Sequence, residues 1–266
     1  MLLSAQDLCV TYRTPGQKPV EAVRGVSFGV ETGRAFGIVG ESGCGKSSLA
    51  RTIIGLQPPT AGTLRFEGHD TGQMDAAAFT RYRRAVQMVF QDAVGSLNPR
   101  MTVRQTVEEV LRVHRMCAPG NIPGRVRGVL DRVGLPETVL DAYPRELSGG
   151  QCQRVSFARC LALEPRLIIA DEPVSALDVS VQARILNLVR TLQKELNLTV
   201  ILISHDLAVV RNICDHVAVM RAGVFVESGK TSKVFDMPQH PYTRELLAAI
   251  PDIARSLSRS PVDSRL

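Results

Sequence analysis

Residues 40–47 match the pattern glycine, any four residues, glycine, lysine and serine. Glycines at this spacing let successive backbone N–H groups curl around phosphate oxygens, and the positive end of a following helix attracts the same charge. In this pattern Lys46 reaches the β- and γ-phosphates, and Ser47 offers its hydroxyl to Mg²⁺. A chance glycine turn is the alternative, which the flanking strand and helix patterns disfavour. The predicted nucleotide contacts come from Gly40, Ser42, Gly43, Cys44, Gly45, Lys46, Ser47 and Ser48.

Two carboxylates follow a short apolar run further along the chain. Residues 167–170 are Leu-Ile-Ile-Ala, and Asp171 and Glu172 come directly after them. An interior strand of this kind ends at the sheet edge where ligands of α/β proteins bind. We expect Asp171 to hold Mg²⁺ through water and Glu172 to orient the attacking water in phosphoryl transfer. A surface acidic pair that caps the next helix is the alternative, and the phosphate loop in the same chain disfavours it.

A second segment joins a helix-capping residue to paired glycines. Residues 147–154 read Leu-Ser-Gly-Gly-Gln-Cys-Gln-Arg. Ser148 can cap the following helix, and the two glycines let backbone amides approach a γ-phosphate closely. The segment therefore predicts a second anion-binding helix end, formed by Ser148, Gly149, Gly150 and Gln151. A flexible turn would be the ordinary interpretation of Ser-Gly-Gly alone.

The strands that must position these motifs can be predicted from hydrophobic periodicity. Alternating apolar residues at 8–12 and 26–30 predict half-buried strands of a small antiparallel region. Short continuous apolar runs predict interior strands of a mostly parallel sheet. These runs are residues 35–39, 86–90, 167–170 and 200–203.

The helices are predicted from spacing and from breaks. Residues 47–56 read as the helix after the phosphate loop, and residues 102–143 read as helices interrupted at 119–124, which we interpret as an inserted helical subdomain. Residues 217–226 predict a closing hairpin, and residues 242–250 predict a final helix.

The phosphate loop, residues 147–154 and residues 167–172, in this order, resemble the motifs of ABC ATPases over nearly the whole chain. The resemblance implies an α/β fold, namely a P-loop NTPase nucleotide-binding domain of ABC type with an antiparallel β subdomain and an inserted helical subdomain. It implies an ATPase domain over about 1–253, with the insertion at about 92–160 and a family segment at about 230–253. Residues 254–266 are then expected to form a flexible tail.

The same resemblance assigns roles to residues that physical reasoning alone would not select. Tyr12 is similar to the aromatic residue that stacks on adenine, although simple packing at a strand end is the alternative. Gln91 resembles the glutamine that meets Mg²⁺ and water and couples the site to the helical subdomain. Asp178 resembles a residue that contacts the partner subunit, and it could also cap the helix from Val179 onward. His205 resembles the histidine that contacts the γ-phosphate.

These roles define the expected chemistry. The cofactors are ATP and Mg²⁺; the catalytic residues are Lys46, Gln91, Glu172 and His205, and the metal-binding residues are Ser47, Gln91 and Asp171. Each motif occurs once, and in ABC proteins the phosphate loop of one domain is completed by the signature segment of another. The resemblance therefore implies that this chain is half of a dimer with an identical or related ATPase subunit.

Two further stretches, residues 89–103 and 240–246, resemble ATP-binding subunits of dipeptide, oligopeptide and nickel importers. The resemblance implies two transmembrane permease subunits, an extracytoplasmic substrate-binding protein and a peripheral location on the cytoplasmic face of the inner membrane. The cargo would be a peptide or a nickel or other metal complex. Two departures from the family pattern are Val174, where threonine is usual, and Cys152 within the signature segment.

The composition excludes some classes of protein but does not by itself assign a function. The net charge of +6 over 266 residues suits ordinary solubility, and also an anionic nucleotide, nucleic acid or acidic membrane face. No run approaches the roughly 20 apolar residues needed to cross a bilayer, no secretory signal is expected, and the six cysteines lack metal-ligand spacing. We expect reduced thiols and no iron–sulfur cluster. A soluble ABC ATPase acting on nucleic acid or ribosomes and a non-catalytic nucleotide-binding regulator are the rival interpretations, and no nucleic-acid partner is expected.

Overall fold

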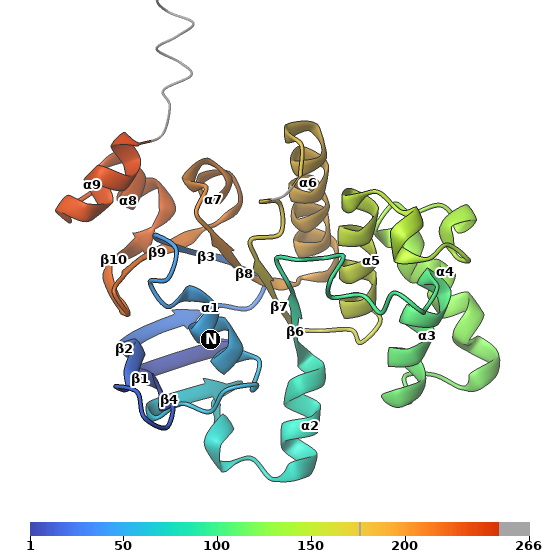
Figure 1. The fold of residues 1–266 in the computed structure, drawn as a ribbon, viewed down its shortest axis with the longest axis horizontal. Helices are drawn as coiled ribbons and strands as arrows, with labels where there is room; N and C mark the ends of the chain where they lie inside the picture. Colours follow the sequence, from blue (N-terminus) through green and yellow to red (C-terminus); the bar gives the residue numbers. More distant parts are fainter. Residues whose placement is uncertain (176, 250–266) are drawn as a thin grey trace, which may run out of the picture.

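A six-stranded sheet forms the centre of the protein in the computed structural model, which describes residues 1–175 and 177–249 (Figure 1). Its strand order is β10-β9-β3-β8-β7-β6, and all neighbours are parallel except β9 and β10. The bounds are β3 (Ala35–Val39), β6 (Val86–Val89), β7 (Leu167–Asp171), β8 (Thr199–Ser204), β9 (His216–Arg221) and β10 (Val224–Lys230). The predicted mostly parallel sheet is thereby confirmed.

Both faces of this sheet are covered, which explains why its strands are continuous apolar runs. In β8, Val200 and Leu202 belong to one hydrophobic core, whereas Ile201 and Ile203 belong to the other. Successive side chains of a strand point to opposite faces, so one run of apolar residues supplies both cores.

A smaller antiparallel sheet, of order β2-β1-β4-β5, packs with the second of these cores. Its strands are β1 (Leu3–Tyr12), β2 (Val20–Val30), β4 (Ala61–Phe66) and β5 (His69–Asp70). Figure 1 shows this sheet beside α1. The antiparallel β region expected from alternation is present, and it also includes β4 and β5, which the alternation did not predict.

The helices lie around and between the two sheets (Figure 1). Their bounds are α1 (Lys46–Ile53), α2 (Ala76–Ala85), α3 (Val103–Val113), α4 (Ile122–Arg132), α5 (Gly149–Leu161), α6 (Val179–Leu196), α7 (Leu207–Ile213), α8 (Thr231–Asp236) and α9 (Pro241–Ala248). Short 3-10 helices are Thr71–Gln73, Pro119–Asn121, Glu137–Val139 and Pro144–Glu146. The predicted helix at 47–56 is shorter than expected, because Gly55 adopts a φ of 73° and ends it.

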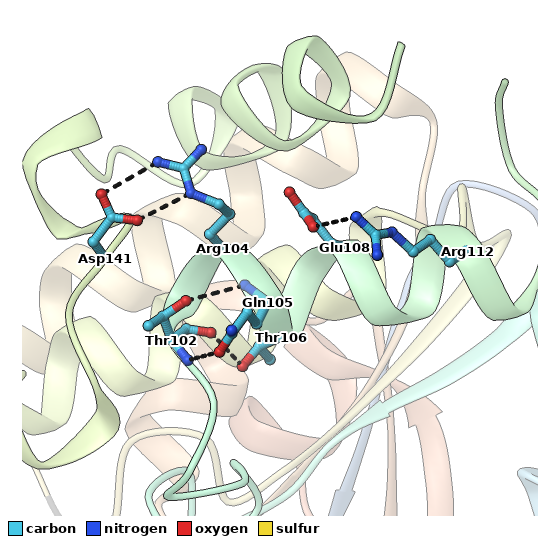
Figure 2. Close-up of polar contacts among 7 residues, drawn as sticks. All are labelled: Thr102, Arg104, Gln105, Thr106, Glu108, Arg112 and Asp141. Carbon is cyan, nitrogen blue, oxygen red and sulfur yellow. Dashed lines mark hydrogen bonds and ion pairs between the residues drawn. The ribbon is translucent and has the colours of Figure 1, made fainter. Parts of the chain in front are cut away.

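Helices α3, α4 and α5 pack on one another at one end of the core sheet (Figure 1). Figure 2 shows how α3 begins: Thr102 and Gln105 form a reciprocal capping box, with distances of 3.3 Å and 2.9 Å. Arg104 donates two hydrogen bonds to Asp141, at 3.0 and 3.3 Å. The cap satisfies backbone groups at both ends of the first turn, and the bidentate pair ties that turn to the chain before α5.

Two predictions about the C-terminal segment extend beyond the described residues. The predicted helix at 242–250 is present as α9, and its last residue lies outside the described residues. The predicted flexible tail at 254–266 lies entirely outside the described residues.

Candidate nucleotide site

The phosphate loop connects β3 to α1, as its pattern predicts. Gly45 precedes α1 with a φ of 112°, a backbone conformation that side chains disfavour. A Cβ atom at Gly45 would lie 2.2 Å from the carbonyl oxygen of Ala22, so the loop can pass β2 only with glycine there. Because α1 begins at Lys46, directly after Gly45, the positive end of this helix faces the same space as the loop amides.

Lys46 is almost fully buried, with 6% of its surface exposed. Its ammonium group donates to the carbonyl oxygens of Gly40 (2.7 Å) and Glu41 (2.8 Å), and it lies 3.8 Å from the Sγ atom of Cys44. The lysine thus closes the loop on itself and holds a positive charge at its centre. Burial raises the pKa of Cys44, so this thiol stays protonated at neutral pH although Lys46 opposes the shift.

Three predicted residues meet where neighbouring parallel strands end. The Nε2 atom of Gln91 donates to Oε2 of Glu172 at 2.8 Å, and Nδ1 of His205 lies 3.2 Å from Oε1 of the same carboxylate. The three residues follow β6, β7 and β8, which are adjacent in the sheet. Only 17% of the Glu172 side chain is exposed, so its carboxylate is held at the sheet edge by partners on both sides.

The backbone of Glu172 is in the left-handed region, with a φ of 45°. Such a conformation costs a residue with a side chain about 1–2 kcal/mol. The Glu172 N–H donates to the carbonyl oxygen of Ile203 at 2.9 Å, which holds this conformation in place. The turn directs the carboxylate away from β7 and toward Gln91 and His205.

Asp171 lies one residue earlier and is buried, with 7% exposed. Burial raises the pKa of Asp171 and the adjacent Glu172 charge adds to the shift, whereas a hydrogen bond from Ser47 and the charge of Lys46 oppose it. The Ser47 hydroxyl, the Asp171 carboxylate and the Gln91 amide are all oxygen donors, the ligand type that Mg²⁺ prefers. This set of donors fits a magnesium ion.

One open cavity of about 1170 Å³ joins most of these residues. Its lining includes Tyr12, Gln91, Glu172, His205 and every residue of the loop from 42 to 48. Gly40 and Asp171 lie behind this lining: Gly40 accepts from Lys46, and Asp171 is buried next to Ser47. Tyr12 is half-buried with its hydroxyl enclosed and without a hydrogen-bond partner among the described residues.

The cavity also has walls that the sequence patterns did not indicate. They come from the start of β2 and the loop before it, and from the turn between β9 and β10. These lining residues are Lys18, Pro19, Val20, Glu21, Ala22, Arg24, Ala222 and Gly223. Lys18, just before β2, and Arg24, within it, add positive charge. Neither residue has a sequence signal that distinguishes it from solvated lysines and arginines.

The predicted second anion site lies elsewhere in the chain. Ser148 caps α5: its hydroxyl accepts from the Gln151 N–H at 3.3 Å, and the side-chain oxygen of Gln151 accepts from the Ser148 N–H at 2.8 Å. Ser148 and Gly149 are exposed, whereas Gly150 is buried. None of these four residues lines the cavity at the phosphate loop, and Figure 1 shows α5 well apart from α1.

Asp178 likewise does not line that cavity. It stands directly before α6, as predicted, but its side chain makes no capping hydrogen bond. The alternative interpretation of Asp178 as the N-cap of this helix is therefore right in position, but the cap has no side-chain hydrogen bond. Gln182 instead donates to the carbonyl oxygens of Val174 and Leu177, and so holds the loop before α6.

Comparison with known protein families shows to which family the chain belongs. Residues 23–175 match the family model described as ABC transporter, which is more than half of the chain. The chain belongs to the ABC transporter family. This ABC ATPase also matches, over residues 226–263, the family described as oligopeptide/dipeptide transporter, C-terminal region. The chain is therefore an ATP-binding protein, and ATP hydrolysis is its reaction.

Curated relatives extend over most of the ABC ATPase. It is 48% identical over 235 residues to the oligopeptide transport ATP-binding protein OppF of Salmonella typhimurium, covering 88% of this chain and 70% of that one. It is 49% identical over 233 residues to the oligopeptide transport ATP-binding protein AppF of Bacillus subtilis, covering 87% and 71%.

Solved structures share the fold. The ATP-binding cassette MJ0796, in a dimeric post-hydrolysis state bound to ADP and Pi, matches with a TM-score of 0.77 and 30% identity over 86% of this chain and 99% of that one. The cbiO1 protein of Clostridium perfringens, part of the ABC transporter complex cbiONQ, matches with a TM-score of 0.79 and 29% identity over 97% and 98%. Within residues 1–175 and 177–249, no helix of the ABC ATPase is long and apolar enough to span a membrane.

Proposed function

We propose that this chain is the ATP-hydrolysing subunit of an importer that takes up peptides. The observation that carries the proposal is the Glu172 carboxylate, which is held between Gln91 and His205 at the cavity of the phosphate loop. The match to the oligopeptide/dipeptide transporter region and the names of both curated relatives support a peptide cargo over a nickel complex. The same names disfavour a soluble ABC ATPase acting on nucleic acid or ribosomes.

In this proposal the phosphate loop and Lys46 hold the β- and γ-phosphates, and Tyr12 lies under the adenine. Glu172 orients and polarises the attacking water, and His205 contacts the γ-phosphate. Phosphoryl transfer depends mainly on such positioning and charge neutralisation, so no covalent intermediate on the protein is needed. Gln91 connects the cavity to the segment that leads to α3.

Magnesium completes the proposed site. Ser47, Gln91 and Asp171, the last through water, would hold the ion, which would neutralise charge on the phosphate oxygens. A bound cation would favour the ionised form of Asp171 and so offset the cost of burying its carboxylate.

The second half of the ATP site would come from another subunit, identical or related. Ser148, Gly149, Gly150 and Gln151 form a capped helix end that lies apart from the cavity of their own chain. A helix end with free N–H groups binds anions, so it fits a γ-phosphate presented by a partner. Asp178 follows Leu177, whose side chain lies beside Gly149, and would contact the same partner.

The proposed assembly includes two transmembrane permease subunits and, indirectly, an extracytoplasmic substrate-binding protein. The chain would sit on the cytoplasmic face of the inner membrane. Residues of about 92–160 would form the helical subdomain of an ATPase domain spanning about 1–253, with the family segment at about 230–253.

The test of the catalytic assignment is Glu172→Gln. The variant should keep ATP binding, lose about 10²–10⁴-fold in turnover, and accumulate as an ATP-bound dimer in size-exclusion chromatography. Glu195→Gln, on the exposed side of α6, is the matched control and should hydrolyse ATP normally. Turnover close to that of the wild type in Glu172→Gln would refute the assignment.

The transport assignment needs a separate measurement. The chain should be purified with its membrane partners and reconstituted in vesicles, and ATP-driven uptake of a labelled peptide should be measured with and without the binding protein. Association with ribosomes or nucleic acid in place of membrane subunits would refute the importer assignment while leaving the ATPase assignment intact.

A further inference from the structure

The C-terminal helix α9 reaches the beginning of the phosphate loop. The backbone N–H of Glu41 donates to the phenolic oxygen of Tyr242, at a distance of 3.2 Å. Tyr242 is almost completely buried, with 2% of its surface exposed, although it lies in a short helix near the end of the described residues. It does not line the nucleotide cavity.

Several contacts fix the position of this tyrosine. The carboxylate of Glu227 accepts from the backbone N–H groups of Gln239 (2.9 Å) and His240 (3.0 Å). Nδ1 of His240 then accepts from the Tyr242 N–H at 3.2 Å, and so caps α9. These bonds tie the start of α9 to β10 before the tyrosine enters the core.

The ring of Tyr242 has a cationic partner as well. The guanidinium of Arg221, at the end of β9, lies 4.6 Å from the ring centroid. Such contacts hold an aromatic ring in one orientation, because the cation is attracted to the ring face. Burial raises the pKa of Tyr242, so its phenol stays neutral at physiological pH and offers a lone pair to Glu41.

The peptide groups around Glu41 are held from both sides. Its N–H is bound by Tyr242, while its carbonyl oxygen and that of Gly40 bind the ammonium of Lys46. The loop has another anchor further on, because the N–H of Gly223 donates to the Cys44 carbonyl at 2.9 Å. Residues after β9 therefore contact the loop at two points, in addition to its covalent connections to β3 and α1.

We propose that Tyr242 is a positioning residue for ATP binding, because its hydroxyl fixes the Glu41 peptide and thereby the carbonyl cradle that holds Lys46. Preorganised groups bind more tightly than groups that must be ordered at the moment of binding. Without the hydroxyl, the peptide between Gly40 and Glu41 keeps only its carbonyl contact to Lys46 and loses the one at its N–H, so the cradle around the Lys46 ammonium is less firmly ordered before ATP binds. The inference deepens the phosphate-loop assignment and depends on it.

The test is Tyr242→Phe, which removes the hydroxyl and keeps the ring. Tyr82→Phe is the matched control: Tyr82 is equally buried, and its hydroxyl donates to the backbone carbonyl of Ile53, at the far end of α1 from the loop. We expect Tyr242→Phe to raise the Kd for a non-hydrolysable ATP analogue roughly three- to tenfold, the effect of one hydrogen bond. Its KM for ATP should rise similarly, with kcat at saturating ATP nearly unchanged.

The control should lower the melting temperature without changing the Kd. An unchanged Kd in Tyr242→Phe, or an equal increase in both variants, would overturn the proposal. Glu227→Ala, which releases the start of α9, provides a second measurement and should shift the Kd in the same direction. Lys46→Ala must weaken binding if the phosphate-loop assignment holds, so a normal Kd in that variant would refute the assignment itself rather than the role of Tyr242.

Discussion

Gly150 offers a quantitative test of why glycine stands at the start of α5. A Cβ atom built at Gly150 would lie 2.5 Å from Cγ1 of Val181, on α6. Valine is stiff at χ1 in a helix, so the clash cannot be relieved by a small rotation of the side chain. Gly150→Ala should therefore overpack this contact at a cost of about 1–3 kcal/mol.

The gain in helix propensity from Gly to Ala partly offsets this cost, so the single variant is a poor measure of the clash. A double-mutant cycle with Val181→Ala removes the propensity contribution, because it is present in both backgrounds. We expect a coupling free energy of about 1–3 kcal/mol, measured by equilibrium urea unfolding of the four proteins. Gly149→Ala is the control: its Cβ would meet only the flexible end of Leu177, at 3.2 Å, and coupling to Leu177→Ala should be small.

A coupling below roughly 0.5 kcal/mol would refute the packing explanation, because that is within the scatter of independent sites. ATPase measurements on the same four proteins test whether Gly150 has a role in phosphate binding in addition to its role in packing. If Gly150 also lets backbone amides approach a partner's γ-phosphate, Val181→Ala should restore the stability of Gly150→Ala without restoring turnover. Full recovery of both would assign Gly150 to packing alone.

Further predictions concern the loop lysine, the first turn of α3 and the anchor of α9. Lys46→Ala should weaken ATP binding roughly 10- to 100-fold, as expected for lost charged hydrogen bonds, and nucleotide titration measures it. Thr102→Ala should lower the free energy of unfolding by about 1 kcal/mol through loss of the capping box, whereas Thr80→Ala, an exposed position on α2, should change it little. Burial works against ionisation of Glu227, but N–H groups of Gln239 and His240 hold its pKa below the ordinary 4.5. A lowered pKa stabilises the fold above about pH 4.5 and that stability is lost as the pH falls, so Glu227→Gln should make the melting temperature less dependent on pH in this acidic range than in the wild type.

The core strands could be predicted from the sequence because burial on both faces leaves a direct signal. Residues 35–39 and 167–170 are continuous apolar runs, and the structure has β3 and β7 there, with β7 one residue longer. The phosphate loop could also be predicted, because its motif requires each glycine and the lysine at a fixed spacing. Helix α2 and strand β4 were not predicted: α2 buries only Tyr82, so it has little hydrophobic periodicity to detect.

The contacts that assemble the site were less accessible to sequence reasoning. Gln91 came from family resemblance alone, and its bond to Glu172 joins residues 81 positions apart. The left-handed backbone of Glu172 has no composition signal, since such conformations are usually expected at glycine. The bond from Glu41 to Tyr242 spans 201 positions, and no local pattern in the segment at residues 240–246 points to the phosphate loop.

The packing of α5 bears on whether the second anion site could ever serve its own chain. Cys152, Val155, Phe157 and Ala158 each have at most 1% of their surface exposed and belong to the core that covers one face of the sheet. Fully burying one large apolar side chain contributes about 1.5–3 kcal/mol, so moving α5 to the α1 face would cost much of the stability of a domain. The capped end at Ser148 therefore stays where it is, exposed and away from the cavity of its own phosphate loop. If this end binds a γ-phosphate as proposed, that phosphate must arrive from another subunit, so the proposed dimer has support from core packing as well as from family resemblance.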